Sequence, residues 1–509
     1  MKQVRQILKQ SLHSGVFFIL TYASRLLLAI ALGKTLAVQD YGVYSLMTAV
    51  VGMGLSLLPL GVTQYYVREV PGLPPEEATT VFKSVVAIQT LVFLAAAALF
   101  ITVPAFHAPL TNAASHQQTG IILLLLVLLL IGEGLATDFG RFLFFRKKIE
   151  QGNIVSFLQS GLWGFALFLV YILRPSFVSL QLVLFLWGCS VVSAVLYGAW
   201  RSNLRILVSA PIRLEFYRRA LFFGFPLLFS QLLAVGNGFG RFVLAHHHSA
   251  QVVGIYTYHY NIILMIAAIA APLVANPLEP YVIEAYNTNQ IDKSGRLLGA
   301  SFRYRIFFVI PLLIVAVFWY RPLIQLMAKK DYLVGPGLLL VLSPIPILAV
   351  FGNTFERILF LQRRSVQIGQ SYLIASILQI GLYLLLVPIH PYWGAAAATN
   401  AGLGTLALLL FIFSRQTEFQ IHLNLGRLGA VTCASLAVAF STARLMPTHL
   451  PPALLLASTT VLIGASFLLF SILFGLLSEG ETRILWDLIR RKKIELKSMV
   501  LGEAANGPR

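Results

Sequence analysis

Long apolar stretches, separated by short polar segments, dominate the chain. Residues 121–130 form one unbroken apolar run, and a stretch of about 18 or more such residues can cross a hydrocarbon core as a helix. The runs lack the alternation of membrane β-barrels, and helices are the other structure that satisfies its backbone in lipid. The pattern predicts an all-α polytopic membrane protein of about 14 transmembrane helices, at residues 14–34, 43–63, 82–104, 119–139, 154–173, 179–200, 221–245, 254–278, 303–320, 337–360, 366–388, 393–413, 428–446 and 453–477.

Composition and charge agree with this reading. Hydrophobic residues make up 58% of the chain and charged residues 11%, whereas soluble domains carry roughly 25% charged residues. The net charge of +19 would suggest nucleic acid in a soluble protein, but with the N-terminus inside, 30 of the 38 Lys and Arg residues fall in cytoplasmic segments and six in outer ones. This is the asymmetry of the positive-inside rule. We therefore expect a cell inner (cytoplasmic) membrane location, both termini in the cytoplasm, and no nucleic-acid partner.

Few residues offer covalent or metal chemistry. Cys189 and Cys433 lie far apart in apolar runs, without metal-ligand spacing. The run His246–His248 falls at the end of a predicted span, where adjacent helical residues do not share a face. No nucleotide-binding glycine loop occurs, and the outer loops are too short to hold a catalytic domain. We expect no enzyme activity, no metal and no cofactor, with H⁺ or Na⁺ as candidate coupling ions.

Two stretches of the chain resemble each other. In each, an arginine lies inside a predicted span, an apolar half-helix follows, and a Gly-x-Tyr sequence opens the next span. The first stretch contains Arg25 and Gly42-Val43-Tyr44, and the second contains Arg241 and Gly254-Ile255-Tyr256, with spacings that differ by four residues. Because the arginines fall in spans 1 and 7, the pattern predicts two related six-span halves, as in many transporters.

These motifs resemble the polysaccharide flippases, often called Wzx-like, of the multidrug/oligosaccharidyl-lipid/polysaccharide exporter superfamily. The resemblance covers roughly residues 10–415 and rests on Ala37-Val38-Gln39-Asp40-Tyr41-Gly42-Val43-Tyr44, Gly224-Phe225-Pro226, Gly240-Arg241-Phe242-Val243-Leu244, Val253-Gly254-Ile255-Tyr256 and Tyr392-Trp393-Gly394-Ala395-Ala396. One departure is Gly240, where many members carry an acid before the arginine.

The resemblance implies a V-shaped transporter with two pseudo-symmetric six-helix lobes around a central cavity, plus two C-terminal helices. We expect an N-terminal lobe at residues 1–210, a C-terminal lobe at 211–424, the last two spans at 425–480, and a basic amphipathic cytoplasmic tail at 481–509. Such a tail suits the surface of anionic lipid, although a solvated charged tail fits equally well.

A flippase needs a cationic cavity, since it moves a pyrophosphate through low dielectric. Arginine suits phosphates because it stays charged and binds bidentately, and a charge inside a span is a functional candidate. Arg25 and Arg241 are the first substrate-binding candidates; pairing with a carbonyl or reaching the interface is the alternative. The set is completed by Asn237, in a glycine-rich stretch, and by Arg68 and Arg305 in cytoplasmic segments. Glu133, deep in span 4, is the coupling-ion candidate.

The implied function is translocation of a lipid-linked oligosaccharide, of the polyprenyl-pyrophosphate type, for cell-surface polysaccharide or lipopolysaccharide biosynthesis. Three alternatives remain open: a flippase for the peptidoglycan lipid precursor, a multidrug cation antiporter, and a membrane polysaccharide polymerase or ligase. Twelve spans and an acidic cavity would favour the antiporter, and a large outer loop would favour the enzyme. The expected partners are the lipid-linked glycan, membrane lipids and polysaccharide assembly proteins, with the chain itself a monomer.

Overall fold

The computed structural model describes most of the predicted spans and the turns between them. The described residues are 2–60, 62, 73–103, 108, 119–146, 148–202, 211–270, 276–417, 419, 421, 423–446 and 450–477. The predicted cytoplasmic tail lies outside them, and so the expected amphipathic helix stays a prediction.

The described chain is helical throughout, as the sequence predicts. The helices of the N-terminal half are α1 (Lys2–Thr35), α2 (Val38–Leu57), α4 (Pro75–Thr102), α6 (Thr119–Phe145), α7 (Ile149–Ser160), α8 (Leu162–Leu173) and α9 (Leu180–Arg201), with the short η2 (Pro175–Phe177). The helices of the C-terminal half are α11 (Leu214–Gly224), η3 (Phe225–Gln231), α12 (Leu232–His247), α13 (Ala250–Ala270), α14 (Asn276–Asn287), α15 (Ile291–Phe318), α16 (Tyr320–Met327), η5 (Lys330–Tyr332), α17 (Pro336–Leu342), α18 (Pro344–Leu361), α19 (Ser365–Leu386) and α20 (Pro391–Arg415). A final pair, α21 (Leu425–Leu445) and α22 (Pro452–Leu473), follows.

Eleven described helices are long and apolar enough to cross a membrane, and the pair α7–α8, bent by 43°, makes a twelfth. The other two of the fourteen predicted spans coincide with α2 and α13, which are 20 and 21 residues long. Tyrosines and polar side chains lower the hydropathy of these two helices. They are central rather than lipid-facing, because α2 packs against both α12 and α13.

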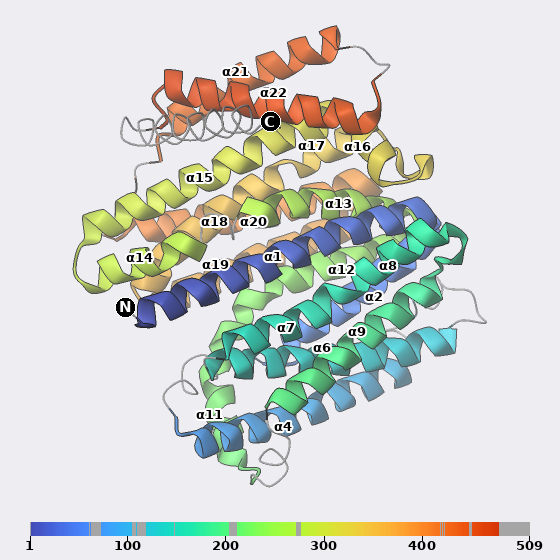
Figure 1. Ribbon diagram of the computed structural model, residues 1–509, viewed down its shortest axis with the longest axis vertical. Helices are drawn as coiled ribbons and strands as arrows, with labels where there is room; N and C mark the ends of the chain where they lie inside the picture. The colour runs from blue at the N-terminus through green and yellow to red at the C-terminus, as the bar shows by residue number, and fades with distance from the viewer. Residues whose placement is uncertain are drawn as a thin grey trace, which may run out of the picture.

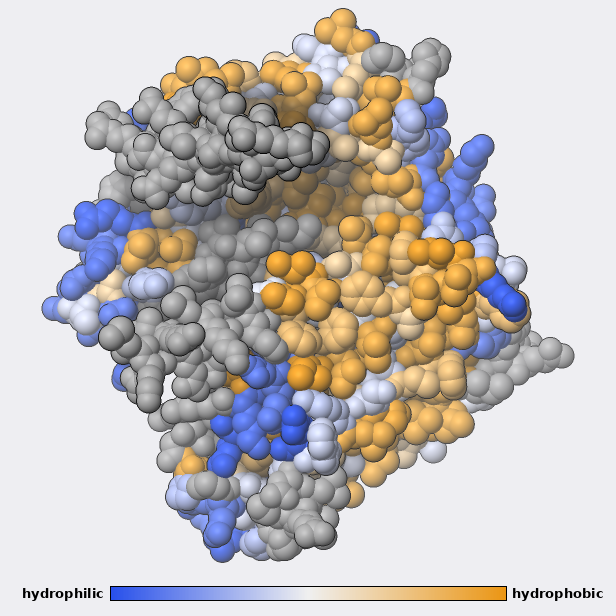
Figure 2. Space-filling model, viewed as in Figure 1, coloured by the Kyte–Doolittle hydropathy of each residue, from blue (hydrophilic) through white to orange (hydrophobic). Residues whose placement is uncertain are grey.

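The two halves use the same packing scheme. In the N-terminal half α1 packs against α7 and α8, and α9 packs against α6 and α7; in the C-terminal half α12 packs against α19, and α20 packs against α18 and α19. The α21–α22 pair lies along one edge of the bundle, against α15 and α16 (Figure 1). Hydrophilic residues gather at the two ends of the helices, to the left and right of the view, with a broad apolar surface between them (Figure 2).

Three predicted spans are interrupted, and in the tenth the break is at Ser343, between α17 and α18. The seventh is divided into α11, the 3₁₀ segment η3, which contains Pro226, and α12. Proline lacks a backbone N–H and cannot continue an α-helical hydrogen-bond ladder. The fifth bends at Gly161, between α7 and α8.

The internal repeat is visible as a reciprocal contact. A Cβ on Gly42 would overlap the carbonyl of Ala250, and a Cβ on Gly254 would overlap the carbonyl of Val38. Residues 42 and 254, and residues 38 and 250, are both 212 apart, so each half presents the same position to the other. Only glycine permits backbones to approach so closely. The Gly-x-Tyr sequences therefore mark the crossing of α2 and α13.

The same offset of 212 residues shows that Arg25 and Arg241 do not occupy equivalent positions in the two halves. The ends of α1 and α12, at Thr35 and His247, are also 212 residues apart, but Arg25 and Arg241 are 216 apart. Arg241 therefore lies one helical turn nearer the end of its helix. A shift of four residues keeps a side chain on the same helical face.

Candidate functional site

A cavity of about 730 Å³ lies between the two halves, within the usual size of a small-ligand pocket. It runs along α1 from Leu32 to Phe18, and side chains of α2, α6, α7, α8, α9, α12 and α13 complete its walls. Its polar and aromatic lining comprises Tyr22, Arg25, Tyr41, Tyr44, Thr48, Glu133, Gln159, Ser160, Trp163, Trp187, Arg241, Tyr258 and Asn261.

The cavity brings together the two arginines singled out in the sequence. Arg25 is an exposed side chain on the cavity face of α1, with its guanidinium 5.8 Å from the ring centre of Tyr22. Arg241 reaches from α12 to α2, where its Nη1 donates to the carbonyl of Ser45 (3.1 Å) and to Oγ1 of Thr48 (3.2 Å). Among the described residues neither arginine forms a salt bridge. Both charges are therefore available to an anion in the cavity.

Glu133 is the one Asp or Glu side chain among the residues that line this cavity, and its exposed fraction is 8%. Nε1 of Trp187 donates to Oε1 (2.6 Å), and the amide of Gln159 donates to Oε2. The Gln159 amide also donates to Oγ1 of Thr137 (2.9 Å). Both carboxylate oxygens thus accept an N–H, and the side chain is fixed in the wall of the cavity.

Aromatic rings flank this carboxylate. Trp163 and Trp187 stack with ring centres 5.8 Å apart and an interplanar angle of 18°, and Tyr44 packs against both at 6.5 and 6.3 Å. We call Glu133, Gln159, Trp163 and Trp187 the aromatic wall. The sequence interpretation missed three of its members. A glutamine and two tryptophans inside predicted spans were a signal, because such polar tips need partners when buried.

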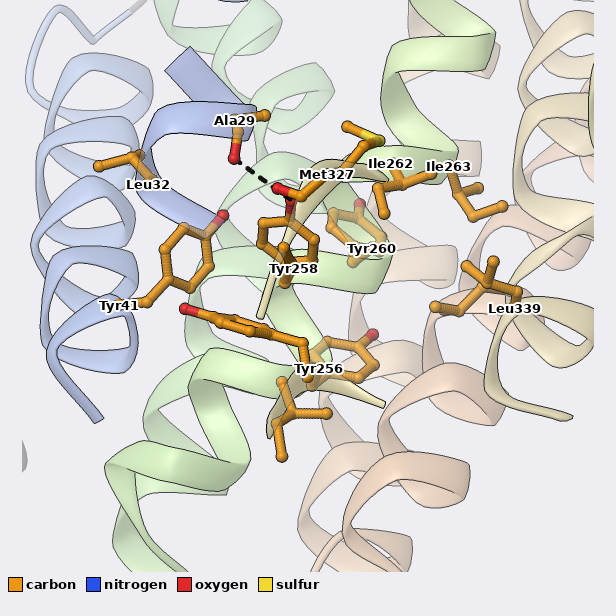
Figure 3. Close-up of a cluster of buried hydrophobic side chains, with 14 of the residues drawn as sticks. Ala29, Leu32, Tyr41, Tyr256, Tyr258, Tyr260, Ile262, Ile263, Met327 and Leu339 are labelled. Atoms are coloured by element: carbon orange, nitrogen blue, oxygen red, sulfur yellow. Dashed lines mark hydrogen bonds between the residues drawn. The ribbon is translucent and has the colours of Figure 1, made fainter. Parts of the chain in front are cut away.

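One end of the cavity is sealed by tyrosines, close to the crossing of α2 and α13. The hydroxyl of Tyr258 hydrogen-bonds with the carbonyls of Met327 (2.8 Å) and Ala29 (3.2 Å), and Tyr41 packs edge-on against Tyr258 with ring centres 5.3 Å apart (Figure 3). Asn261 donates to the hydroxyl of Tyr41 (3.1 Å). We call this region the sealed end.

Two lysines that do not line the cavity join the helix ends at the sealed end. Nζ of Lys34, in the last turn of α1, donates to the carbonyl of Gln325 near the end of α16 (2.5 Å), and Nζ of Lys329 donates to the carbonyl of Thr35, the last residue of α1 (2.5 Å). Helix C-termini carry unpaired carbonyls and a partial negative charge. Each lysine therefore caps the helix that belongs to the opposite half.

Asn237 does not line the cavity. Its Oδ1 accepts a hydrogen bond from Nε2 of Gln379 (2.7 Å) on α19. Gln379 also donates to the hydroxyl of Tyr383 (3.3 Å), which pairs with Thr399 (2.7 Å), which in turn pairs with Tyr256 (3.2 Å). This chain of uncharged groups, which we call the C-terminal network, joins α12, α19, α20 and α13 inside the bundle.

Arg305 also lies away from the cavity. It is buried on α15, where its Nη2 donates to Oγ1 of Thr354 (2.6 Å) and its Nε to the carbonyl of Ser301 (3.3 Å). Arg68 falls outside the described residues. The cavity thus unites Arg25, Arg241 and Glu133, and leaves Asn237 and Arg305 in the interior of the C-terminal half.

The arrangement suits binding of an anionic group. Two cations and one carboxylate leave a positive excess in a cavity of mostly apolar walls, where electrostatic attraction is stronger than in water. Among the described residues no group of three or more His, Cys, Asp or Glu side chains could hold a metal ion.

Comparisons with solved structures show the fold. The lipid II flippase MurJ in an inward closed conformation has a TM-score of 0.69 and 16% identity over 92% of this chain and 98% of that one. An inward-facing multidrug resistance MATE transporter of the MOP superfamily has a TM-score of 0.60 and 16% identity over 80% and 97% of the chains. A MOP superfamily transporter from Pyrococcus furiosus, with a TM-score of 0.52, is 15% identical over 81% and 94%.

Sequence comparison supplies the family. No curated protein matches the chain. The model of the family described as "polysaccharide biosynthesis protein" matches residues 7–285, more than half of the chain. With its many apolar helices, the chain is a multi-pass membrane protein with the fold of the MurJ and MATE structures, and it belongs to the polysaccharide biosynthesis protein family.

Proposed function

We propose that the protein translocates an oligosaccharide linked to a polyprenyl pyrophosphate across the cytoplasmic membrane, for biosynthesis of a cell-surface polysaccharide. The observation that carries this proposal is the pair Arg25 and Arg241 in one cavity between the halves. A charge deep in the bilayer costs roughly 2.5–3.5 kcal/mol. Two such charges, neither in a salt bridge among the described residues, are explained by an anionic substrate, and a pyrophosphate matches the bidentate geometry of arginine.

The state of the cavity fits the first step of such transport. With the N-terminus in the cytoplasm, the sealed end faces the outside, and the cavity extends from it toward the cytoplasmic part of α1. A substrate made in the inner leaflet would enter a cavity of this orientation. Of the structures compared above, MurJ is in an inward closed conformation and the MATE transporter with a TM-score of 0.60 is inward-facing.

Deletion of the gene tests the proposal. The expected result is loss of a surface polysaccharide and accumulation of its lipid-linked repeat in the inner leaflet, both reversed by the wild-type chain. If the deletion strain instead accumulates the peptidoglycan precursor and lyses, the protein is a peptidoglycan precursor flippase. Unchanged glycans with greater sensitivity to cationic drugs would identify a multidrug antiporter.

The energy source is part of the proposal. Glu133 is the carboxylate through which H⁺ or Na⁺ could be coupled to transport, because it faces the cavity within electrostatic reach of Arg25. Transport by Glu133→Gln in vesicles with imposed H⁺ or Na⁺ gradients tests it. Coupling through Glu133 requires the variant to lose its response to one gradient, and an unchanged response would exclude that role.

The orientation is proposed from the loop charges. Reporter fusions after Lys148 and Arg219 should report cytoplasm, and a fusion near Pro109 should report the outside. An outside signal at Arg219 would contradict the arrangement. We also propose that the chain acts as a monomer beside polysaccharide assembly proteins, a state that cross-linking in native membranes would detect.

A further inference from the structure

The aromatic wall has a chemical character that pyrophosphate binding does not use. Arginines alone would suffice to hold a phosphate, yet the same cavity also presents two tryptophans, a carboxylate and an amide. Trp163, Trp187 and Glu133 are each more than nine-tenths buried in the wall. Burial of a carboxylate is costly unless its interactions repay it, and the N–H donors of Trp187 and Gln159 hold it in place.

We propose that the aromatic wall is the subsite for the first sugar of the carrier, and that it selects a neutral hexose or N-acetylhexosamine over an acidic sugar. This inference rests on the proposed function and names the substrate class of the same cavity.

Sugars present two kinds of surface, and the wall matches both. The C–H face of a pyranose packs on an aromatic ring, and its rim of hydroxyl and amide groups needs polar partners. Trp163, Trp187 and Tyr44 supply the rings. Because the amide nitrogen of Gln159 is already directed at Glu133 and Thr137, the Gln159–Glu133 pair offers a ligand acceptors only: the Gln159 carbonyl and the remaining lone pairs of the carboxylate.

The position of the wall agrees with the covalent structure of the carrier. Tyr44 packs against both tryptophans of the wall, and Arg241 is hydrogen-bonded to its neighbours Ser45 and Thr48 on α2. The wall and the arginines therefore line the same part of the cavity. A pyrophosphate and the sugar bonded directly to it are also adjacent, and one ligand can engage both sides. Later sugars would extend along the cavity toward Phe18.

The carboxylate provides the selection. Acceptors at Glu133 and Gln159 pair with the hydroxyls of a neutral sugar or the N–H of an acetamido group. A hexuronic acid would place a second carboxylate against Glu133, and a like-charge contact away from water is strongly unfavourable. Discrimination thus comes from a repulsive group as well as from attractive contacts.

The inference is tested with the purified full-length chain in detergent, where no ion gradient is present. Native mass spectrometry measures the affinity of each probe. Three probes are compared: undecaprenyl pyrophosphate alone, the same carrier with one N-acetylglucosamine, and the same carrier with one glucuronic acid. We expect the N-acetylglucosamine probe to bind about tenfold more tightly than either other probe, a difference of about 1.4 kcal/mol. Since no gradient is present, a coupling role of Glu133 cannot produce this pattern.

Variants assign the effect to the wall. In Trp163→Leu, the N-acetylglucosamine probe should bind less than about threefold more tightly than the bare carrier. In Glu133→Gln, the affinity of the glucuronic acid probe should come to within about threefold of that of the N-acetylglucosamine probe. Each sugar probe is compared with the bare carrier bound by the same variant, because Glu133→Gln removes a negative charge near Arg25 and should itself strengthen binding of the pyrophosphate. Trp200→Leu, at an exposed tryptophan on α9, is the matched control. If Trp163→Leu does not fold, Glu133→Gln and Trp163→Phe carry the test.

The outcomes separate this inference from the proposed function. Equal binding of all three probes by the wild type, or full sugar discrimination in Glu133→Gln and the Trp163 variants, would overturn the sugar subsite and leave the flippase proposal standing. If Arg25→Ala binds the bare carrier as tightly as the wild type does, pyrophosphate recognition is wrong and the proposed function fails with it.

Discussion

The N-terminal and C-terminal halves share a packing scheme but place their polar groups differently. In the N-terminal half, charged and aromatic side chains of α1, α6 and α9 point into the cavity, among them Arg25, Glu133 and Trp187. In the C-terminal half, α12, α19 and α20 direct uncharged groups toward one another, so that Gln379 and Tyr383 are buried in the C-terminal network. A repeated backbone therefore does not imply repeated chemistry. The N-terminal half directs most of its polar groups toward a ligand, whereas the C-terminal half contributes Arg241 to the cavity and uses the C-terminal network to join its own helices.

The largest effect should come from the cavity charge of the N-terminal half. Arg25→Ala removes charge-assisted hydrogen bonds worth roughly 1.5–3 kcal/mol each, so transport should fall about 10- to 100-fold while insertion is unaffected. Arg25→Lys keeps the charge but loses the bidentate guanidinium, and so it should lose only part of the transport activity. The measurement is surface glycan at equal expression in the deletion strain. Arg174→Ala, in the turn between α8 and α9, is the control. Full export by Arg25→Ala would contradict the view that the cavity charge of the N-terminal half serves the ligand.

The contact between the halves should be the next most sensitive. Gly42→Ala would force a methyl group into the Ala250 carbonyl, and overpacking typically costs about 1–3 kcal/mol. We expect a lower Tm and transport reduced to about a tenth or less. Gly52→Ala on the same helix meets nothing within 4 Å and should behave as the wild type. A stable and active Gly42→Ala protein would show that the halves do not depend on this crossing.

A smaller effect, and one of a different kind, is expected from the C-terminal network. Tyr383→Phe removes a hydroxyl that pairs with Thr399 and Gln379, which should cost about 1 kcal/mol of folding stability and little of the carrier affinity. Thermal unfolding and carrier binding, measured on the same preparation, separate the two quantities. Tyr281→Phe, an exposed tyrosine, is the control. Loss of carrier affinity without loss of stability would mean that this half also serves the ligand.

The smallest effect should be at the lysine caps of the sealed end. Lys329→Met removes an exposed contact, worth about 0.2–1 kcal/mol, and should raise the outside accessibility of the cavity about two- to fivefold. Labelling of a Thr48→Cys protein by an impermeant maleimide measures this, after Cys189 and Cys433 are replaced. The neighbouring Lys330→Met should have no effect. Unchanged labelling of Lys329→Met would show that the tyrosines alone hold this end closed.

The sequence predicts the frame of the molecule better than the details of its site. Apolar runs and the two Gly-x-Tyr sequences were sufficient for the helical fold and for the repeat, and a charge inside a span was sufficient to single out Arg25 and Arg241 as cavity residues. The glutamine and the two tryptophans of the aromatic wall could be noticed singly, but the wall could not be assembled from the sequence, because its members come from three spans. Periodicity assigns a residue to a helix face, but it does not say which face of another helix is opposite.

The same limit explains Asn237 and Arg305. Both are polar and lie on helices of the C-terminal half, and both were expected in the cavity. Asn237 instead pairs with Gln379, and Arg305 pairs with Thr354. Each partner lies more than 40 residues away along the chain. A polar residue in a span can be satisfied by a neighbouring helix as well as by a ligand, and local sequence does not distinguish the two.

The reciprocal contact of Gly42 with Ala250 and of Gly254 with Val38 has the geometry of an isologous interface, in which residue i of one subunit meets residue j of the other and j meets i. In a symmetric homodimer both copies of such an interface would be encoded by one gene, and every substitution would appear twice. Here the two copies are separate positions of one chain. A charge such as Glu133 can therefore enter one half without entering the other, which an identical pair of subunits could not achieve.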